Sequence, residues 1–202
     1  MDDELLWGDF LKGSRASLQD IYSRYYQNLY SYGMRKLNDP EIVRDCIQDL
    51  FVHLWTSRGN LNPTNNIKYY LLASLRNRLV RASAMDDKWQ KVELSSANLF
   101  HVQFDLESDY IQKENISQKA KMLIDGLDQL TPRQKEVLYL RYFEELGYEQ
   151  IAELLDLSVK GVYKLNYRAI DALKIILDVS KTDLLVLLLL CRVEILQQFH
   201  SF

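Results

Sequence analysis

The sequence predicts an all-α fold with two helical domains joined by a linker, the C-terminal domain being a helix-turn-helix. The 202 residues include only 7 glycines and 3 prolines, fewer turn residues than an all-β chain of this length requires. Apolar side chains recur at three- and four-residue steps in several stretches, as in amphipathic helices. That period is absent from residues 95–109. We therefore expect domains at residues 1–92 and 119–202, an acidic linker at 93–118, and a helix starting near residue 111.

The N-terminal domain is expected to contain three amphipathic helices. The second runs from Glu41 to Ser57, because Asp39 is a good N-cap and Pro40 suits the first helical position. The third follows an asparagine-rich loop, residues 59–66, and extends from about Ile67 to Ala84. The first is indicated by a stripe that we expect to face the core, formed by Leu18, Ile21, Tyr22, Tyr25, Leu29 and Tyr32.

Apolar residues cover more than half the circumference of the helix at residues 41–57. Such a helix packs on two sides, against two neighbouring helices or against one helix and an external partner. The remaining face carries Asp45, Gln48, Asp49 and Val52.

The segment from Lys68 to Lys91 is the most basic of the chain, with six positive side chains against two negative ones. Single-stranded DNA binds to surfaces that combine planar rings, which stack on bases, with cations that follow the phosphates. Tyr69, Tyr70 and Asn77 accompany the cations here. The same helix must also supply core residues, so we expect Tyr70 to be partly buried.

Residues 131–134 carry the strongest local signal of a helix start. Thr131 is a suitable N-cap, Pro132 suits the first helical position, and Gln134 can complete a capping box. A helix is therefore predicted to begin at Pro132.

A helix-turn-helix is predicted further along the chain. A break at Gly147 is followed by a short helix at residues 148–155, a tight turn at Asp156 and Leu157, and a long helix with Ser158 as N-cap.

The helix after Ser158 has two distinct faces. Its buried stripe is expected to be Val162, Leu165, Ala169, Leu173 and Ile176. The opposite face carries Lys160, Lys164 and Arg168 at four-residue steps, with Tyr163 and Tyr167 beside them. Such a face can enter a DNA major groove, although it is also typical of an ordinary solvated surface. Gly161 either admits close approach to DNA or lies at a frayed helix end.

Several functional classes are disfavoured by the sequence as a whole. The net charge is −3, so long-range attraction will not draw the whole protein to nucleic acid, and any DNA contact must be local. No phosphate loop, metal-ligand spacing or nucleophile motif is present, so we expect no enzymatic activity and no cofactor or metal. Cys46 and Cys191 lie in apolar stretches and are expected to be reduced.

The two ends of the sequence favour a cytoplasmic protein without a membrane span. Residues 1–4 are acidic, whereas a secretory signal begins with positive charge. The continuous apolar run at residues 184–191 would form a helix of about 12 Å, far shorter than a hydrocarbon core of about 30 Å.

Four stretches, in this order, resemble an extracytoplasmic-function (ECF) RNA polymerase sigma factor, in particular the short type common in Bacteroidetes. They are residues 18–37, the segments DCIQDLFVHLW at 45–55 and NIKYYLLASLRN at 66–77, and residues 130–173. The resemblance covers about residues 6–177. It implies a protein without catalytic activity that directs core RNA polymerase to specific promoters and aids the opening of their DNA.

The resemblance also implies a division of labour, with residues 1–92 as sigma region 2 and residues 119–202 as region 4. The clamp helices of the largest polymerase subunit would bind Asp45, Gln48, Asp49, Val52 and Trp55. The melted −10 promoter element would bind Asn66, Lys68, Tyr69, Tyr70, Arg76, Asn77, Arg78 and Arg81. The upstream −35 element would bind Ser158, Lys160, Gly161, Tyr163, Lys164, Tyr167 and Arg168. Region 4 would also dock on the polymerase β flap.

The sequence departs from the family in two places. Asp156 replaces the usual turn glycine, and aspartate tolerates a left-handed backbone better than most residues. A leucine-rich tail, residues 184–202, extends past the usual end; we expect it to cap the second domain's core, the alternative being a docking surface for a partner such as an anti-sigma factor. Two other functions stay open: a stand-alone helix-turn-helix regulator that binds an operator without polymerase, and a helical adaptor that binds acidic proteins.

Overall fold

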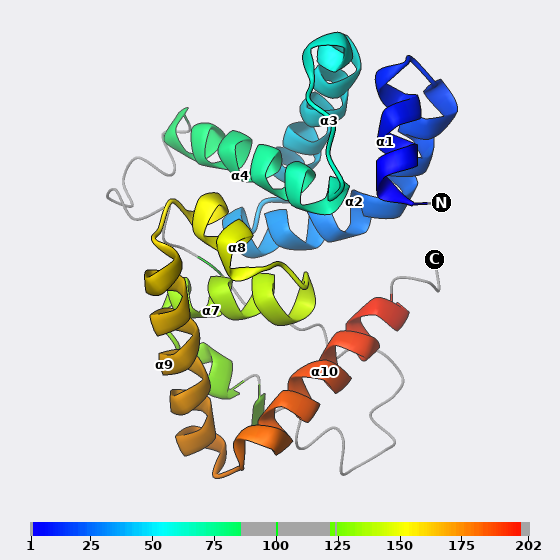
Figure 1. The fold of residues 1–202 in the computed structure, drawn as a ribbon. Helices are drawn as coiled ribbons and strands as arrows, with labels where there is room; N and C mark the ends of the chain where they lie inside the picture. The colour runs from blue at the N-terminus through cyan, green and yellow to red at the C-terminus, as the bar shows by residue number, and fades with distance from the viewer. Residues whose placement is uncertain (1, 86–99, 101–121, 124, 199–202) are drawn as a thin grey trace. The chain divides into compact units, whose positions relative to one another are not determined.

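The computed structural model describes residues 2–85, 100, 122–123 and 125–198, with the side chains of all but 85 and 190–198 (Figure 1). The chain divides into two compact units, residues 1–99 and 100–202. Every regular element in the described residues is helical, which confirms the all-α prediction. The predicted linker at 93–118 and the helix start near residue 111 lie outside the described residues, except Phe100, which is buried against Tyr139 of the second unit.

The first unit contains α1 (Asp3–Leu11), α2 (Arg15–Leu37), α3 (Pro40–Ser57), the 3-10 turn η1 (Arg58–Asn60) and α4 (Ile67–Met85). Each of α2, α3 and α4 packs against the other two, and α1 packs against α2. Asp39 caps α3 by accepting hydrogen bonds from the N–H groups of Glu41 and Ile42, as predicted. The fully buried core side chains include Ile21, Leu29, Tyr32, Val43, Ile47, Leu50, Leu54, Ile67, Leu71 and Leu75.

The sequence did not predict α1, which buries Leu6, Trp7 and Phe10. These residues have helical spacing, but a helix of 9 residues is too short for the repeated pattern that identified the longer helices. The signal that could have found it is the three- and four-residue spacing of three large apolar side chains just before Gly13.

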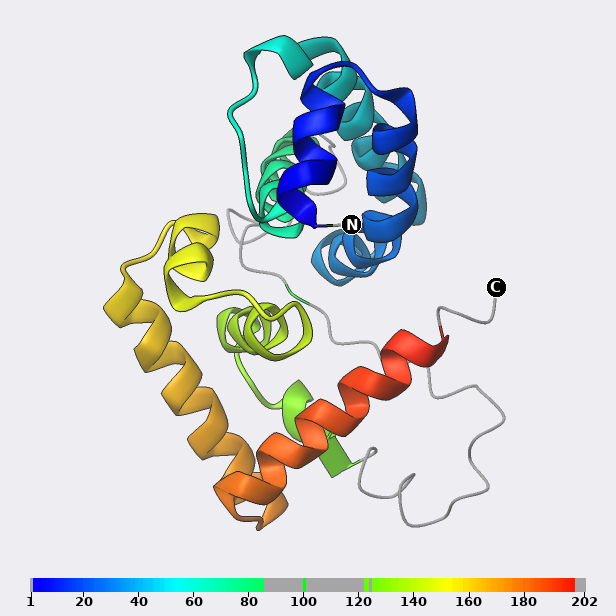
Figure 2. The same cartoon turned by 45° about the vertical axis from the view of Figure 1, so that its right-hand side comes forward.

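The second unit contains α7 (Pro132–Leu138), the π-helical turn η4 (Tyr139–Phe143), α8 (Tyr148–Leu155), α9 (Val159–Leu177) and α10 (Lys181–Gln198). The capping box formed by Thr131 and Gln134 is present as predicted. Figure 2 shows α10 turning back at the end of α9. The helix α10 packs against α9 and η4. Leu184 and Leu188 of α10 are fully buried, which supports the expectation that the tail caps this core.

Two predicted buried stripes are partly wrong. In α2, Leu18 is only half-buried and Tyr22 is 42% exposed, because both lie at the edge of the interface with α3. In α9, Leu165 and Ile176 are half-buried. The stripe that faces the core there consists of Val162, Asn166, Ala169, Ile170, Leu173 and Leu177. The observed stripe is rotated around the helix relative to the predicted one, because the polar residue Asn166 lies on the buried side. A prediction from hydrophobic spacing leaves such a residue out.

Gly33 of α2 is the most closely packed glycine of the first unit. A Cβ atom at this position would lie 2.6 Å from Val43 Cγ1 of α3, which is closer than real Cβ atoms approach their neighbours. The glycine therefore permits α2 and α3 to approach. Gly8 of α1 is the opposite case, since a Cβ atom there would meet nothing within 4 Å.

We expect the two glycines to respond to alanine in opposite directions. Gly33→Ala should lower the free energy of unfolding by about 1–3 kcal/mol, because the added methyl group overpacks the interface with Val43. Gly8→Ala should raise it by about 0.5–1 kcal/mol, because alanine is the better helix former where space is available. Chemical denaturation measures both, and Val43→Ala should recover part of the loss in Gly33→Ala. A Gly33→Ala protein as stable as the parent would contradict the close packing.

Candidate nucleic-acid and polymerase interfaces

The turn between α8 and α9 has the tight geometry of a helix-turn-helix. Asp156 adopts a left-handed backbone, with φ 57° and ψ 51°, in the place predicted for it. The N–H of Leu157 donates to the carbonyl of Ala152 at 2.9 Å, which closes the end of α8. Ser158 then caps α9 by accepting a hydrogen bond from the N–H of Gly161 at 3.0 Å. The aspartate therefore supports the turn that glycine usually makes.

The cationic face of α9 is open. Lys160, Lys164 and Arg168 are all exposed. Tyr163 is 50% exposed and Tyr167 is 69% exposed. These five side chains are therefore available to a partner of the second unit.

Ser158 and Gly161 have roles within the helix itself. The hydroxyl of Ser158 is engaged as the N-cap, and a Cβ atom at position 161 would lie 3.1 Å from that oxygen. The presence of glycine at position 161 is thus explained locally, because the Ser158 cap leaves little room for a side chain there.

A cluster of polar and aromatic side chains holds Tyr163, and the sequence did not predict it. The rings of Tyr148 and Tyr163 stack with centroids 3.9 Å apart and an interplanar angle of 25°. The guanidinium carbon of Arg141 lies 4.8 Å from the centroid of the Tyr148 ring, and Nη1 of Arg141 donates to the Leu146 carbonyl. Because Tyr148 is fixed, the neighbouring ring of Tyr163 is restrained on the surface of α9.

Asn166 fixes the cluster from the core side. It is 8% exposed, and its Nδ2 donates to the Tyr148 hydroxyl at 3.1 Å and the Tyr142 hydroxyl at 3.4 Å. Burial raises the pKa of Tyr142, while the hydrogen bond with Asn166 acts in the opposite direction. The signal that could have found the cluster is the spacing of Asn166 from Val162 and Ala169 on the buried face.

The basic surface predicted on α4 divides into two groups. Asn66, Tyr70, Asn77 and Arg81 follow one another at helical spacings of four, seven and four residues, so they share one side of the helix. Asn77 and Arg81 are exposed, and Tyr70 is half-buried as expected.

The other predicted α4 residues are less accessible. Arg76 and Arg78 are half-buried, and their Nε atoms are buried without a hydrogen-bond partner among the described residues. Arg78 lies near enough to the Cys46 thiol of α3 to lower its pKa, although burial and Asp49 outweigh it and raise that pKa overall. Lys68 and Tyr69 are also half-buried.

Asn66 has a structural role at the start of α4. Its side-chain oxygen accepts a hydrogen bond from the N–H of Tyr69 at 2.9 Å. The amide oxygen is therefore engaged as the helix cap.

The candidate polymerase face lies on α3. Asp45, Gln48 and Asp49 are exposed, and Val52 is 55% exposed. Trp55 is half-buried, with the guanidinium carbon of Arg58 4.2 Å from its ring centroid. An apolar side chain and carboxylates therefore lie side by side on this helix.

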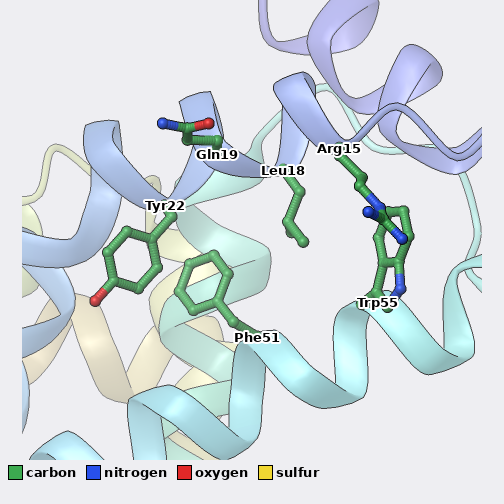
Figure 3. Close-up of a pocket in the computed structure, with 6 residues that line it drawn as sticks. All are labelled: Arg15, Leu18, Gln19, Tyr22, Phe51 and Trp55. Carbon is green, nitrogen blue, oxygen red and sulfur yellow. The ribbon is translucent and has the colours of Figure 1, made fainter.

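Trp55 also lines a pocket of about 420 Å³ between α2 and α3, which the sequence did not predict (Figure 3). Arg15 lies beside the Trp55 ring, with its guanidinium carbon 5.8 Å from the ring centroid. Tyr22 and Phe51 meet edge to face with centroids 4.9 Å apart. The lining residues are Arg15, Leu18, Gln19, Tyr22, Phe51 and Trp55. Tyr22 and Leu18 were assigned to the core because they continue the apolar stripe of α2. Only the position of α3 shows that they border this pocket.

Neither a metal centre nor a membrane span is found in the part of the chain that the structure describes. There, no three His, Cys, Asp or Glu side chains are grouped as metal ligands. No described helix is long and apolar enough to cross a bilayer. Cys46 is buried and free, and the side chain of Cys191 lies outside the described ones.

Known proteins are similar in sequence to both units. The family model "Sigma-70 region 2" matches residues 21–87, and the model "Sigma-70, region 4" matches residues 120–173. The chain is 30% identical over 156 residues to the RNA polymerase sigma factor YlaC of Bacillus subtilis (strain 168), covering 77% of this chain and 88% of that protein. It is 23% identical over 162 residues to the ECF RNA polymerase sigma factor SigK of Mycobacterium sp. (strain KMS), covering 79% and 82%.

Two solved structures share the fold. One is CnrH in complex with the cytosolic domain of CnrY, with a TM-score of 0.55 and 19% identity over 87% of this chain and 97% of that chain. The other is the sigma factor RpoE of Bartonella quintana in complex with the anti-sigma factor NepR, with a TM-score of 0.54 and 18% identity over 80% and 97%.

The α9 geometry predicts that inward and outward residues differ sharply in their effect on stability. Asn166→Ala should lower the free energy of unfolding by about 1–3 kcal/mol, because it removes a buried side chain and the hydrogen bonds it donates to two half-buried tyrosine hydroxyl groups. Arg168→Ala, two positions away on the exposed face, should change it by less than about 0.5 kcal/mol. Denaturant titration of both variants tests this, and equal losses would show that the assignment of faces is wrong.

Proposed function

The chain belongs to the ECF class of the sigma-70 family of RNA polymerase sigma factors, and we propose that its described surfaces divide the work of that family between the two units. It directs RNA polymerase to promoters. Within the class we assign it to the short type common in Bacteroidetes, on the resemblance of the four stretches at residues 18–37, 45–55, 66–77 and 130–173. Residues 1–92 serve as region 2, residues 93–118 as the acidic linker, and residues 119–202 as region 4 with the leucine-rich tail.

We assign recognition of the −35 element to α9. The observation that carries this proposal is the exposed row of Lys160, Lys164 and Arg168 on a helix that follows a tight turn. In a helix-turn-helix the second helix enters the major groove, where cations meet phosphates and guanine edges. Tyr163 and Tyr167 flank the row and add planar contacts. Ser158 and Gly161 contribute by shaping the first turn of the helix, where backbone N–H groups face a phosphate.

We assign capture of the melted −10 element to the open side of α4. Tyr70 offers a ring for stacking, Asn77 an amide for hydrogen bonds, and Arg81 a cation for the phosphates. Arg76 and Arg78 add positive charge from half-buried positions. Asn66, Lys68 and Tyr69 lie at the start of the same helix. Because unpaired DNA is stabilised by such contacts, this surface aids promoter opening.

We assign binding of the clamp helices to the exposed face of α3. Its acidic residues Asp45 and Asp49 suit a basic partner, while Val52 and Trp55 supply apolar contact. Gln48 lies between them, and the pocket at Trp55 extends the apolar area toward α2. The second unit docks on the β flap. The partners are therefore core RNA polymerase and promoter DNA.

We propose three further assignments that accord with the family. The protein has no catalytic activity of its own, needs no cofactor, and acts in the cytoplasm, where its polymerase is. We also propose that an anti-sigma factor regulates it, in view of the solved complex of RpoE with NepR. With a net charge of −3, the chain depends on polymerase to bring its local cationic faces to DNA.

We expect the purified protein to bind duplex DNA weakly alone and to direct discrete transcripts when mixed with core polymerase. Sequencing the transcripts made with and without it tests this and identifies the promoter. A chain that does not bind core polymerase would contradict the proposal. Tight binding to an operator without polymerase would instead identify a stand-alone regulator.

The assigned DNA face predicts a specific loss of upstream recognition. Lys160→Ala, Lys164→Ala and Arg168→Ala should each weaken binding of the polymerase complex to the −35 element by about fivefold or more, since a side chain that reaches bases or phosphates is lost. Lys174→Ala is the matched control, because it removes the same charge from the far end of α9. Electrophoretic mobility-shift titration measures the affinities. Unchanged binding in all three variants, or an equal loss in the control, would rule out this face.

A further inference from the structure

The first helix, α1, is joined to the start of α4 by contacts that differ from ordinary core packing. It lies before the segment matched by the region 2 model, which begins at residue 21. Leu6 and Phe10 of α1 are completely buried and fill the core. Asp3 and Trp7, in contrast, make directional hydrogen bonds to the backbone of the segment that leads into α4.

Trp7 holds the beginning of that segment and one residue of α4. Its Nε1 donates to the carbonyl of Asn62 at 3.0 Å. Its ring packs against Tyr70, with centroids 5.0 Å apart and an interplanar angle of 58°. Because Trp7 is only 1% exposed, its ring is a rigid support behind the half-buried ring of Tyr70.

Asp3 holds the end of the same segment. Its Oδ2 accepts a hydrogen bond from the N–H of Ile67, the first residue of α4, at 3.2 Å. A carboxylate in this place is favourable because helix N-termini carry free N–H groups and partial positive charge. The hydroxyl of Tyr25 donates to Asp3 at 2.7 Å. Burial and, to a smaller extent, this hydrogen bond raise the pKa of Tyr25 to about 12.

These contacts fix residues 62–67 at both ends. Within the segment Asn62, Pro63 and Asn65 are exposed. The segment therefore has few apolar contacts of its own that could order it. A binding surface that is ordered before its ligand arrives does not lose affinity to the entropy of ordering.

We propose that Asp3 and Trp7 are positioning residues for promoter opening, which hold residues 62–67 and the ring of Tyr70 in the arrangement that takes up unpaired promoter DNA. This inference rests on the proposed assignment of the −10 element to α4. The ligand is a single DNA strand, and α1 acts through Tyr70 and the backbone without touching the DNA.

The test uses the full chain assembled with core polymerase and a fluorescent single-stranded oligonucleotide that carries the −10 element of the mapped promoter. Trp7→Leu should weaken its binding, measured by anisotropy, by about tenfold, which is within the range of one base–aromatic stacking contact. Binding to −35 duplex should not change. Trp7→Phe keeps a ring behind Tyr70 but loses the N–H, so its loss should be smaller. Asp3→Asn, a milder change to the fold, should also weaken oligonucleotide binding.

Two controls separate positioning from stability. Leu5→Ala changes an exposed residue of α1 and should have no effect on either DNA. Phe10→Leu removes a buried ring that packs against Trp7 but cannot hydrogen-bond to the 62–67 segment, so it should lower the melting temperature and weaken oligonucleotide binding less than Trp7→Leu does. The proposal is wrong if Trp7→Leu and Asp3→Asn bind the oligonucleotide like the parent, or if Phe10→Leu loses as much affinity as Trp7→Leu.

Tyr70→Ala distinguishes this inference from the assignment beneath it. If Tyr70→Ala binds the oligonucleotide normally, the α4 site itself is wrong. If Tyr70→Ala binds weakly and the Trp7 and Asp3 variants bind normally, the α4 site stands and the role of α1 is rejected.

Discussion

Close packing between α2 and α3 sets the geometry of the first unit. Gly33 leaves no room for a methyl group beside Val43, so α3 lies against α2 with its aliphatic side chains turned inward. α4 closes the third side and buries Leu71 and Leu75. The surfaces that we assign to polymerase and DNA are what remains once this core is filled, because Asp45 and Asp49 of α3 and Asn77 and Arg81 of α4 stay exposed.

The second unit depends on a polar contact inside an otherwise apolar stripe. Asn166 lies where a hydrophobic residue would be expected, and it joins the tyrosines at positions 142 and 148 by hydrogen bonds. Because hydrogen bonds are directional, these two contacts orient the tyrosine rings more narrowly than aliphatic packing alone would. The exposed ring of Tyr163 is restrained as a result, since it stacks on Tyr148.

Local chemistry was predictable from the sequence, and contacts between distant segments were not. The caps at Asp39, Thr131 and Ser158 and the left-handed turn at Asp156 depend on a few neighbouring residues, so each was predicted correctly. The exposed positions of the lysines and arginine on α9 follow from helical spacing alone. The inward placement of Asn166 and the pocket beside Tyr22 depend on partners more than 15 residues away, which periodicity does not reveal.

The separation of core residues from outward-facing residues on α9 has an evolutionary consequence. Residues 162, 166, 169, 170, 173 and 177 maintain the core, whereas residues 160, 164 and 168 contribute no buried contact. Substitutions on the outer row are therefore nearly free of cost to the fold. Duplicated copies of such a gene can therefore diverge in this row, and with it in the DNA that we propose it selects, one side chain at a time, while every intermediate remains a folded protein.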